Sequence, residues 1–136
     1  MNRLLIALIL SLASAVAWAC SVNPLIHVFN DSRERVVVRV GNKVYVAEPS
    51  RQTSFVYKDA DVAVQIGDRS VLYRIAFLPP GYRRTGWFRS HITFQIEPDR
   101  RVFVLKAHDM PPIEAASYEQ PEGYPLVPSS DDTRGG

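Results

Sequence analysis

The residues best suited to chemistry form one short stretch, 82–89, in which three arginines interleave with three aromatic residues. Arginine offers a planar fork of donors that fits carboxylate or phosphate and stacks on rings. Tryptophan and tyrosine anchor interfaces, and with arginine they are common hot-spot residues. This composition indicates a contact site for an anionic glycan, a lipid head group or a partner protein. The candidate binding residues are Tyr82, Arg83, Arg84, Trp87 and Arg89.

An alternative interpretation of the same stretch is structural. Trp87 and Phe88 could close one end of the fold while the arginines are simply solvated, because large aromatic residues are often buried. The two interpretations differ in where they place the Trp87 side chain. The sequence alone leaves both open.

Motifs of catalysis are nearly absent from the chain. There is no HExxH, no glycine-rich phosphate loop and no GxSxG, and nothing marks a serine as a nucleophile. His27 and His91 fall in apolar alternating runs and could converge on one sheet face, whereas His108 lies beyond the last run. A metal needs three or four ligands, and neither strand histidine has an acid or cysteine at ligand spacing. We therefore expect no metal, no cofactor and no enzymatic activity.

The only cysteine, Cys20, directly follows an apolar leader. Residues 1–19 contain one charge, at Arg3, then a largely apolar run, and they end with small residues at Ala17 and Ala19. This layout is typical of a secretory signal peptide, and it is too short for a good membrane span. An exported chain with one cysteine cannot form an internal disulfide, so the thiol needs another explanation.

The junction at Cys20 resembles the signal of bacterial lipoproteins, although Ala17 stands where that pattern usually has Leu. The resemblance implies that residues 1–19 are removed, that Cys20 carries the lipid, and that residues 20–24 form a linker. Ser21 replaces the Asp that often retains such proteins at the inner membrane, which implies an outer-membrane lipoprotein facing the periplasm. The alternatives are cleavage before Cys20 or after Ala15, giving a soluble periplasmic or secreted protein, and an uncleaved anchor.

Eight short apolar runs follow the leader, and they alternate with turn residues. Two pairs of runs are joined by Gly41-Asn42 and by Gly67-Asp68, the two-residue links of tight hairpins. No helical period extends over three turns. The sequence therefore predicts an all-β domain over residues 25–108, a small antiparallel sandwich or barrel of seven or eight strands. The runs are 25–29, 35–40, 43–47, 53–57, 62–66, 70–77, 88–97 and 102–106.

Residues 109–136 differ in composition from the domain before them. They hold five prolines and 6 acidic residues against one basic residue. Such a segment buries little apolar surface, so we expect a disordered tail that is dispensable for folding. Residues 20–108 carry 14 Lys and Arg against 8 Asp and Glu, which gives a basic body.

A basic exported domain without catalytic motifs is expected to be a lipid-anchored binding protein of the cell envelope. Its partner would be an envelope protein or an anionic glycan or lipid, and we do not expect nucleic acid as a partner of an exported protein. Two other classes stay open. An inhibitor of a hydrolase would present one rigid protruding loop, and an enzyme would show a pocket with convergent titratable groups.

Overall fold

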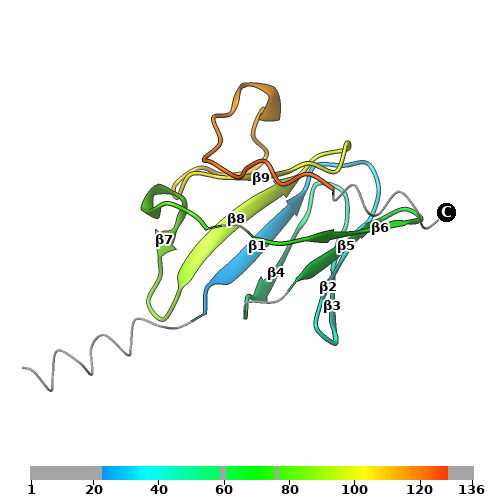
Figure 1. The fold of residues 1–136 in the computed structure, drawn as a ribbon, viewed down its shortest axis with the longest axis horizontal. Coiled ribbons are helices and arrows are strands. Elements are labelled where there is room, and N and C mark those ends of the chain that lie inside the picture. Colours follow the sequence, from blue (N-terminus) through cyan, green and yellow to red (C-terminus); the bar gives the residue numbers. More distant parts are fainter. Residues whose placement is uncertain (1–22, 59–60, 76, 129–136) are drawn as a thin grey trace, which may run out of the picture.

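Alternating apolar residues form strands along almost the whole domain. The computed structural model describes residues 23–58, 61–75 and 77–128, and these contain nine strands and two short 3-10 helices. The all-β fold class is confirmed, with one short strand more than predicted (Figure 1). The strands are β1 (Leu25–Asn30), β2 (Val36–Val40), β3 (Lys43–Ala47), β4 (Gln52–Val56), β5 (Val62–Ile66), β6 (Arg69–Tyr73), β7 (Arg84–Thr85), β8 (Ser90–Ile96) and β9 (Val102–Val104), and the helices are η1 (Pro80–Tyr82) and η2 (Ala115–Ser117).

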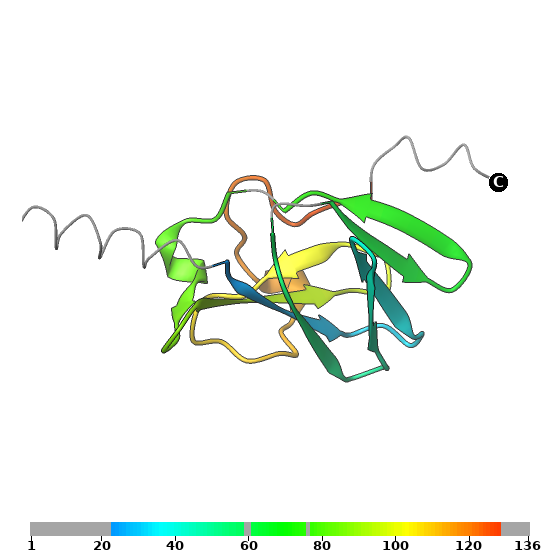
Figure 2. The ribbon, with the colours of Figure 1, turned by 90° about the horizontal axis from the view of Figure 1, so that it is seen from below.

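The strands form two sheets that stack as a sandwich (Figure 2). The first sheet has the order β4-β1-β8-β7, with β9 pairing along the same edge of β8, and the second has the order β3-β2-β5-β6. All pairs are antiparallel except β1 with β8, which run parallel and depart from the wholly antiparallel expectation. A parallel pair needs a long crossover, and the whole second sheet lies between β1 and β8 in sequence.

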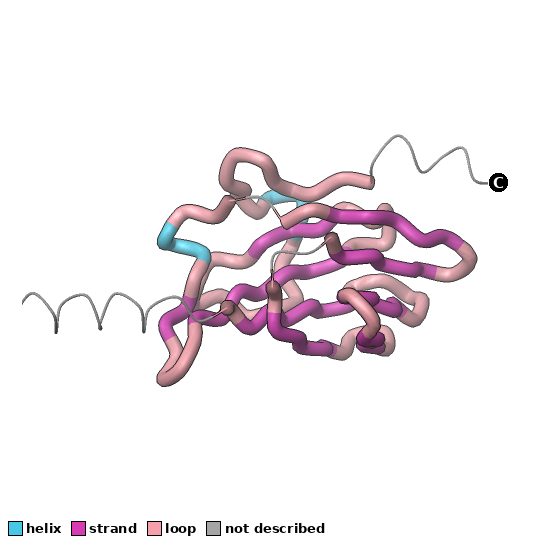
Figure 3. The backbone as a smooth tube through the Cα atoms, turned by 60° about the horizontal axis from the view of Figure 1, so that its bottom comes forward, coloured by secondary structure: helices cyan, strands magenta, loops and turns pink. Residues whose placement is uncertain are grey.

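The two tight hairpins predicted from sequence are both present. β2 pairs with β3 across Gly41-Asn42, and β5 pairs with β6 across Gly67-Asp68. Gly41 and Gly67 have φ of 60° and 59°, as the first position of a type II′ turn requires. Figure 3 shows that strands and connecting loops make up nearly all of the described chain.

Inward-facing residues of both sheets form one apolar core. The alternating apolar residues of β2, β5 and β8 point into this core, because a strand alternates its side chains between the two faces of a sheet. One expectation fails at the end of β6. The apolar run 70–77 predicts a single strand, but β6 stops at Tyr73, Phe77 is 84% exposed, and the next residue, Leu78, is buried.

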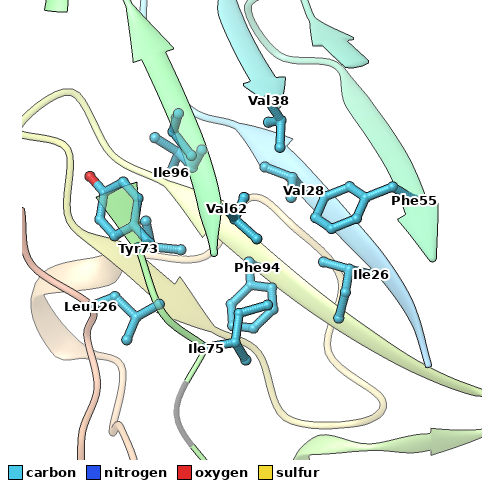
Figure 4. Close-up of a pocket in the computed structure, with 12 residues that line it drawn as sticks. Ile26, Val28, Val38, Phe55, Val62, Tyr73, Ile75, Phe94, Ile96 and Leu126 are labelled. Carbon is cyan, nitrogen blue, oxygen red and sulfur yellow. The ribbon is translucent and has the colours of Figure 1, made fainter. Parts of the chain in front are cut away.

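A small cavity of about 30 Å³ lies between the sheets. Figure 4 shows the side chains that line it, and they come from both sheets and from Ile75 and Leu126, which lie outside the strands. Organic ligands occupy sites of roughly 300–1,000 Å³. The cavity is therefore a packing defect rather than a ligand site.

The segment after Asp109 packs on the first sheet, so the predicted disorder is wrong for residues 109–128. Leu126 and Val102 exchange two backbone hydrogen bonds of 2.9 Å, and Tyr124 is buried in the core cluster. The Gln120 side chain donates to the carbonyl of Val104 at 2.8 Å and accepts from its N–H at 2.9 Å. These contacts pair the outer edge of β9, which would otherwise expose backbone groups. Residues 129–136 lie outside the described part of the chain.

A second glutamine fixes the same segment over the outer face of the first sheet. Gln95 on β8 is fully buried, and its amide exchanges hydrogen bonds of 2.8 and 3.0 Å with the backbone of Ile113. Composition underestimates how firmly such a segment is attached, because hydrogen bonds of side-chain amides, and not only burial of apolar side chains, hold it on the sheet.

Candidate functional site

The arginine–aromatic stretch forms a hairpin at one end of the first sheet. β7 pairs with β8 through Arg84↔His91 and Thr85↔Ser90. The chain reverses over residues 86–89, here called the hairpin tip, where the Gly86 N–H donates to the Arg89 carbonyl at 3.1 Å. A Cβ at Gly86 would lie 2.5 Å from that carbonyl oxygen and 2.7 Å from His91 Nε2. Glycine is therefore required for the close approach that shapes the tip.

The two aromatic residues of the tip project into solvent. Trp87 is 97% exposed and Phe88 is 83% exposed. Their ring centroids are 6.5 Å apart, and the rings are tilted by 50°. The alternative in which they close one end of the sandwich is wrong, because the β7–β8 turn carries them beyond the last strand pair. Two adjacent exposed aromatic rings form an unusual surface for a solvated loop.

Three arginines flank these rings in sequence. Arg83 follows η1 and Arg84 begins β7, and both are exposed, whereas Arg89 in the tip is half-buried. Within the described residues none of the three forms an ion pair, since the salt bridges there involve other cations. Their charges are therefore not neutralised by neighbouring carboxylates at contact distance.

Tyr82 is placed apart from the other candidate residues. It ends η1, where its N–H donates to Pro79, and its side chain packs partly against the core cluster. The exposed candidate surface therefore consists of the hairpin tip with Arg83 and Arg84. Phe88, which was not among the candidate residues, belongs to this surface because it lies beside Trp87 and is almost as exposed.

A histidine pair lies on the outer face of the first sheet, next to the hairpin. His27 on β1 and His91 on β8 are stacked, with ring centroids 5.1 Å apart and 8° between the planes. Their nearest nitrogens, His27 Nε2 and His91 Nδ1, are 2.8 Å apart. His27 Nδ1 lies 2.7 Å from Ser54 Oγ and 3.2 Å from Gln52 Nε2. The sequence indicated that these histidines could converge, and the parallel register of β1 and β8 brings them together.

The surroundings favour a neutral His27. Burial lowers the pKa of His27 below its usual value, and the nearby His91 and Arg84 lower it further. The described residues contain no group of three or more His, Cys, Asp or Glu side chains that could hold a metal ion. The His91 ring packs against Gly86, at the start of the hairpin tip.

Ser54, His27 and His91 form a chain of hydrogen bonds, and such a chain resembles the serine–histidine arrangement of a catalytic triad. Ser54, however, lies in the middle of β4 (Gln52–Val56) and not on a strained turn that would present its hydroxyl to a substrate. Of the three residues, His91 is the one that lies against the hairpin, since its Nε2 would be 2.7 Å from a Cβ at Gly86. A triad is recognised by the roles of its members and not by their proximity.

Cys20 and the leader fall outside the described residues, so the predicted lipidation site stays a prediction. Within the described ranges, no helix has both the length and the apolar character needed to cross a bilayer. Comparison with known proteins adds no assignment, because no family model, no curated protein and no solved structure matches this chain.

Proposed function

We propose that this protein is an exported, lipid-anchored, non-catalytic component of the bacterial cell envelope that binds another envelope component through its β7–β8 hairpin. One observation carries the proposal: Trp87 and Phe88 stand exposed beside three arginines that have no ion-pair partner among the described residues. Burial of exposed aromatic surface on a partner is favourable, and arginine supplies directional contacts to anions.

The anchor is proposed at Cys20, in an outer-membrane lipoprotein facing the periplasm. It is supported by the leader of residues 1–19 and by the lone thiol at its end. Mass spectrometry of the native N-terminus should show a lipidated Cys20. Cys20→Ala should move the protein from the membrane fraction to the soluble fraction. An unmodified thiol at Cys20, or cleavage after Ala15, would contradict the anchor.

The binding role is tested by site-specific photo-crosslinking in intact cells. A photoreactive residue at position 87 should give adducts with an envelope component. The matched control carries the same residue at position 72, because Leu72 is also exposed, at 56%, but lies on β6 in the second sheet. Equal labelling from positions 87 and 72, or none from either, would count against the tip as the binding site.

Alanine substitution separates binding from folding. Replacing Arg83, Arg84 and Arg89 together should weaken capture about 30-fold or more, since a desolvated arginine anchor contributes about 2 kcal/mol. The melting temperature should change little, because Arg83 and Arg84 are exposed, the half-buried Arg89 forms no ion pair among the described residues, and surface substitutions seldom change stability by more than about 0.5 kcal/mol each. Trp87→Ala should behave in the same way. Unchanged capture by both variants would refute the assignment.

A further inference from the structure

The hairpin tip lies at the end of the molecule where the chain enters the first sheet. Leu25, at the start of β1, is the register partner of His91 on β8, and His91 is the partner of Arg84 on β7. The parallel pairing of β1 and β8 places their starts side by side. Figure 1 shows the start of β1 and the β7–β8 turn at the same end of the sandwich.

Chain lengths keep the leader close to this end. Cys20 precedes Leu25 by five residues, so it lies within roughly 18 Å of it. Trp87 precedes His91 by four residues, which bounds their separation at about 14 Å. A membrane attachment through residues before Leu25 would therefore leave the tip within reach of the bilayer surface, whether that attachment is a lipid on Cys20 or the apolar leader itself.

The residues of the tip match the chemistry of that surface. Tryptophan is enriched at the membrane–water interface, where an amphipathic ring sits at head-group level. Phe88 adds apolar area beside it, and arginine side chains bind phosphate oxygens while their stems contact apolar material. Basic residues beside a membrane attachment favour anionic lipids, each raising the docked-to-free ratio about fivefold.

We propose that the hairpin docks on an anionic phospholipid bilayer, with Trp87 and Phe88 at the head-group boundary and Arg83, Arg84 and Arg89 on lipid phosphates. The inference rests on the proposed binding role of the tip and names its partner. A bilayer fits better than a protein or glycan, because the aromatic rings lie on a turn beyond the last strand pair, at the end where the leader joins. The lipid at Cys20 and the tip would act as two attachment points, which together hold a protein more firmly than one.

Tryptophan fluorescence tests this directly, since the chain has only Trp18 and Trp87. The protein carrying Trp18→Phe, with its N-terminus as cells leave it, is reconstituted into vesicles with brominated acyl chains. In phosphatidylcholine with phosphatidylglycerol, Trp87 emission should shift to the blue and be quenched by bromine. In phosphatidylcholine alone the effect should be smaller. Replacing Arg83, Arg84 and Arg89 with glutamine should lower the docked-to-undocked ratio on the order of a hundredfold.

A matched probe distinguishes docking of the tip from general contact with lipid. In this control Trp18→Phe and Trp87→Phe are combined with Leu72→Trp, which keeps an aromatic ring at the tip and moves the only tryptophan to an exposed site on β6. This probe should remain unquenched. Equal quenching at position 72 would overturn the proposal, as would solvent-like emission of Trp87 in anionic vesicles.

Two further readouts separate the possible partners. Soluble glycerol phosphate should leave the quenching unchanged; full displacement by it would mean that the arginines recognise a free phosphate group and not a bilayer. If Trp87 is unquenched while a crosslinker at position 87 captures a protein or glycan, the lipid assignment fails and the proposed function stands. If Trp87 is unquenched and the crosslinker at position 87 captures nothing, both the lipid assignment and the proposed binding function fail.

Discussion

Replacing Gln120 with alanine should destabilise the domain, although Gln120 lies in the segment that composition predicts to be disordered. Its side-chain amide makes both hydrogen bonds to the backbone of Val104, at 2.8 and 2.9 Å, and Val104 is fully buried. Leaving a buried backbone group unpaired costs about 1–3 kcal/mol. Gln120 itself is half-exposed, so water can reach part of the space it leaves. We therefore expect a loss of about 2 kcal/mol for the two bonds together.

For a folded unit of this size, about 2 kcal/mol lowers the melting temperature by roughly 10 °C, which thermal unfolding followed by circular dichroism can measure. Glu119→Ala is the control, because Glu119 is exposed and its contact with Lys106 is a long surface ion pair of 3.9 Å. That variant should unfold within a degree or two of the native protein. If Gln120→Ala also does so, residues 109–128 do not hold the edge of β9 and the argument from hydrogen bonding is wrong.

Three further changes test the hairpin, the histidine pair and the core. Gly86→Ala should cost about 1–3 kcal/mol in chemical denaturation and weaken partner capture, because the new Cβ would lie 2.5 Å from the Arg89 carbonyl oxygen. The pKa of His27 in the folded protein is lower than its unfolded value of about 6.5. Its contribution to the free energy of unfolding is therefore fully present above pH 6.5 and is lost as the pH falls through the folded pKa. His27→Gln should flatten this part of the stability profile, and an unchanged profile would contradict the assignment. Val62→Ile should fill part of the 30 Å³ cavity and add up to about 0.7 kcal/mol, seen as a melting temperature higher by a few degrees, whereas a fall would indicate overpacking.

Local pattern was sufficient to predict eight of the nine strands and both tight hairpins, whereas β7 was missed. Alternation in β2, β5 and β8 identifies the buried face, because a slip of one residue would turn every apolar side chain to solvent. Gly41 and Gly67 mark the turns because only glycine adopts their positive φ without strain. Both features are set by residues that are close together in sequence, so the local sequence pattern is enough to predict them.

The C-terminal segment could not be predicted in the same way. Its proline content and acidity are properties of the whole segment, and they indicate little buried apolar surface. Its attachment depends instead on particular hydrogen bonds, including those of the Gln95 and Gln120 side-chain amides. Each amide forms hydrogen bonds with the backbone of a residue that is distant in sequence, so a local sequence pattern cannot predict these bonds. The histidine pair is a parallel case, since His27 and His91 meet only in the β1–β8 register.

The parallel pairing of β1 with β8 has the largest consequence for function. In an antiparallel pair, the start of β1 would lie at the opposite end of β8 from the tip. Six residues of strand span about 20 Å, so the leader would then emerge far from Trp87. The parallel register instead brings Leu25, His91 and Arg84 into one row. The composition of residues 82–89 predicts a contact site, but only this row shows that these residues lie at the end of the sheet where the chain before Leu25 enters it.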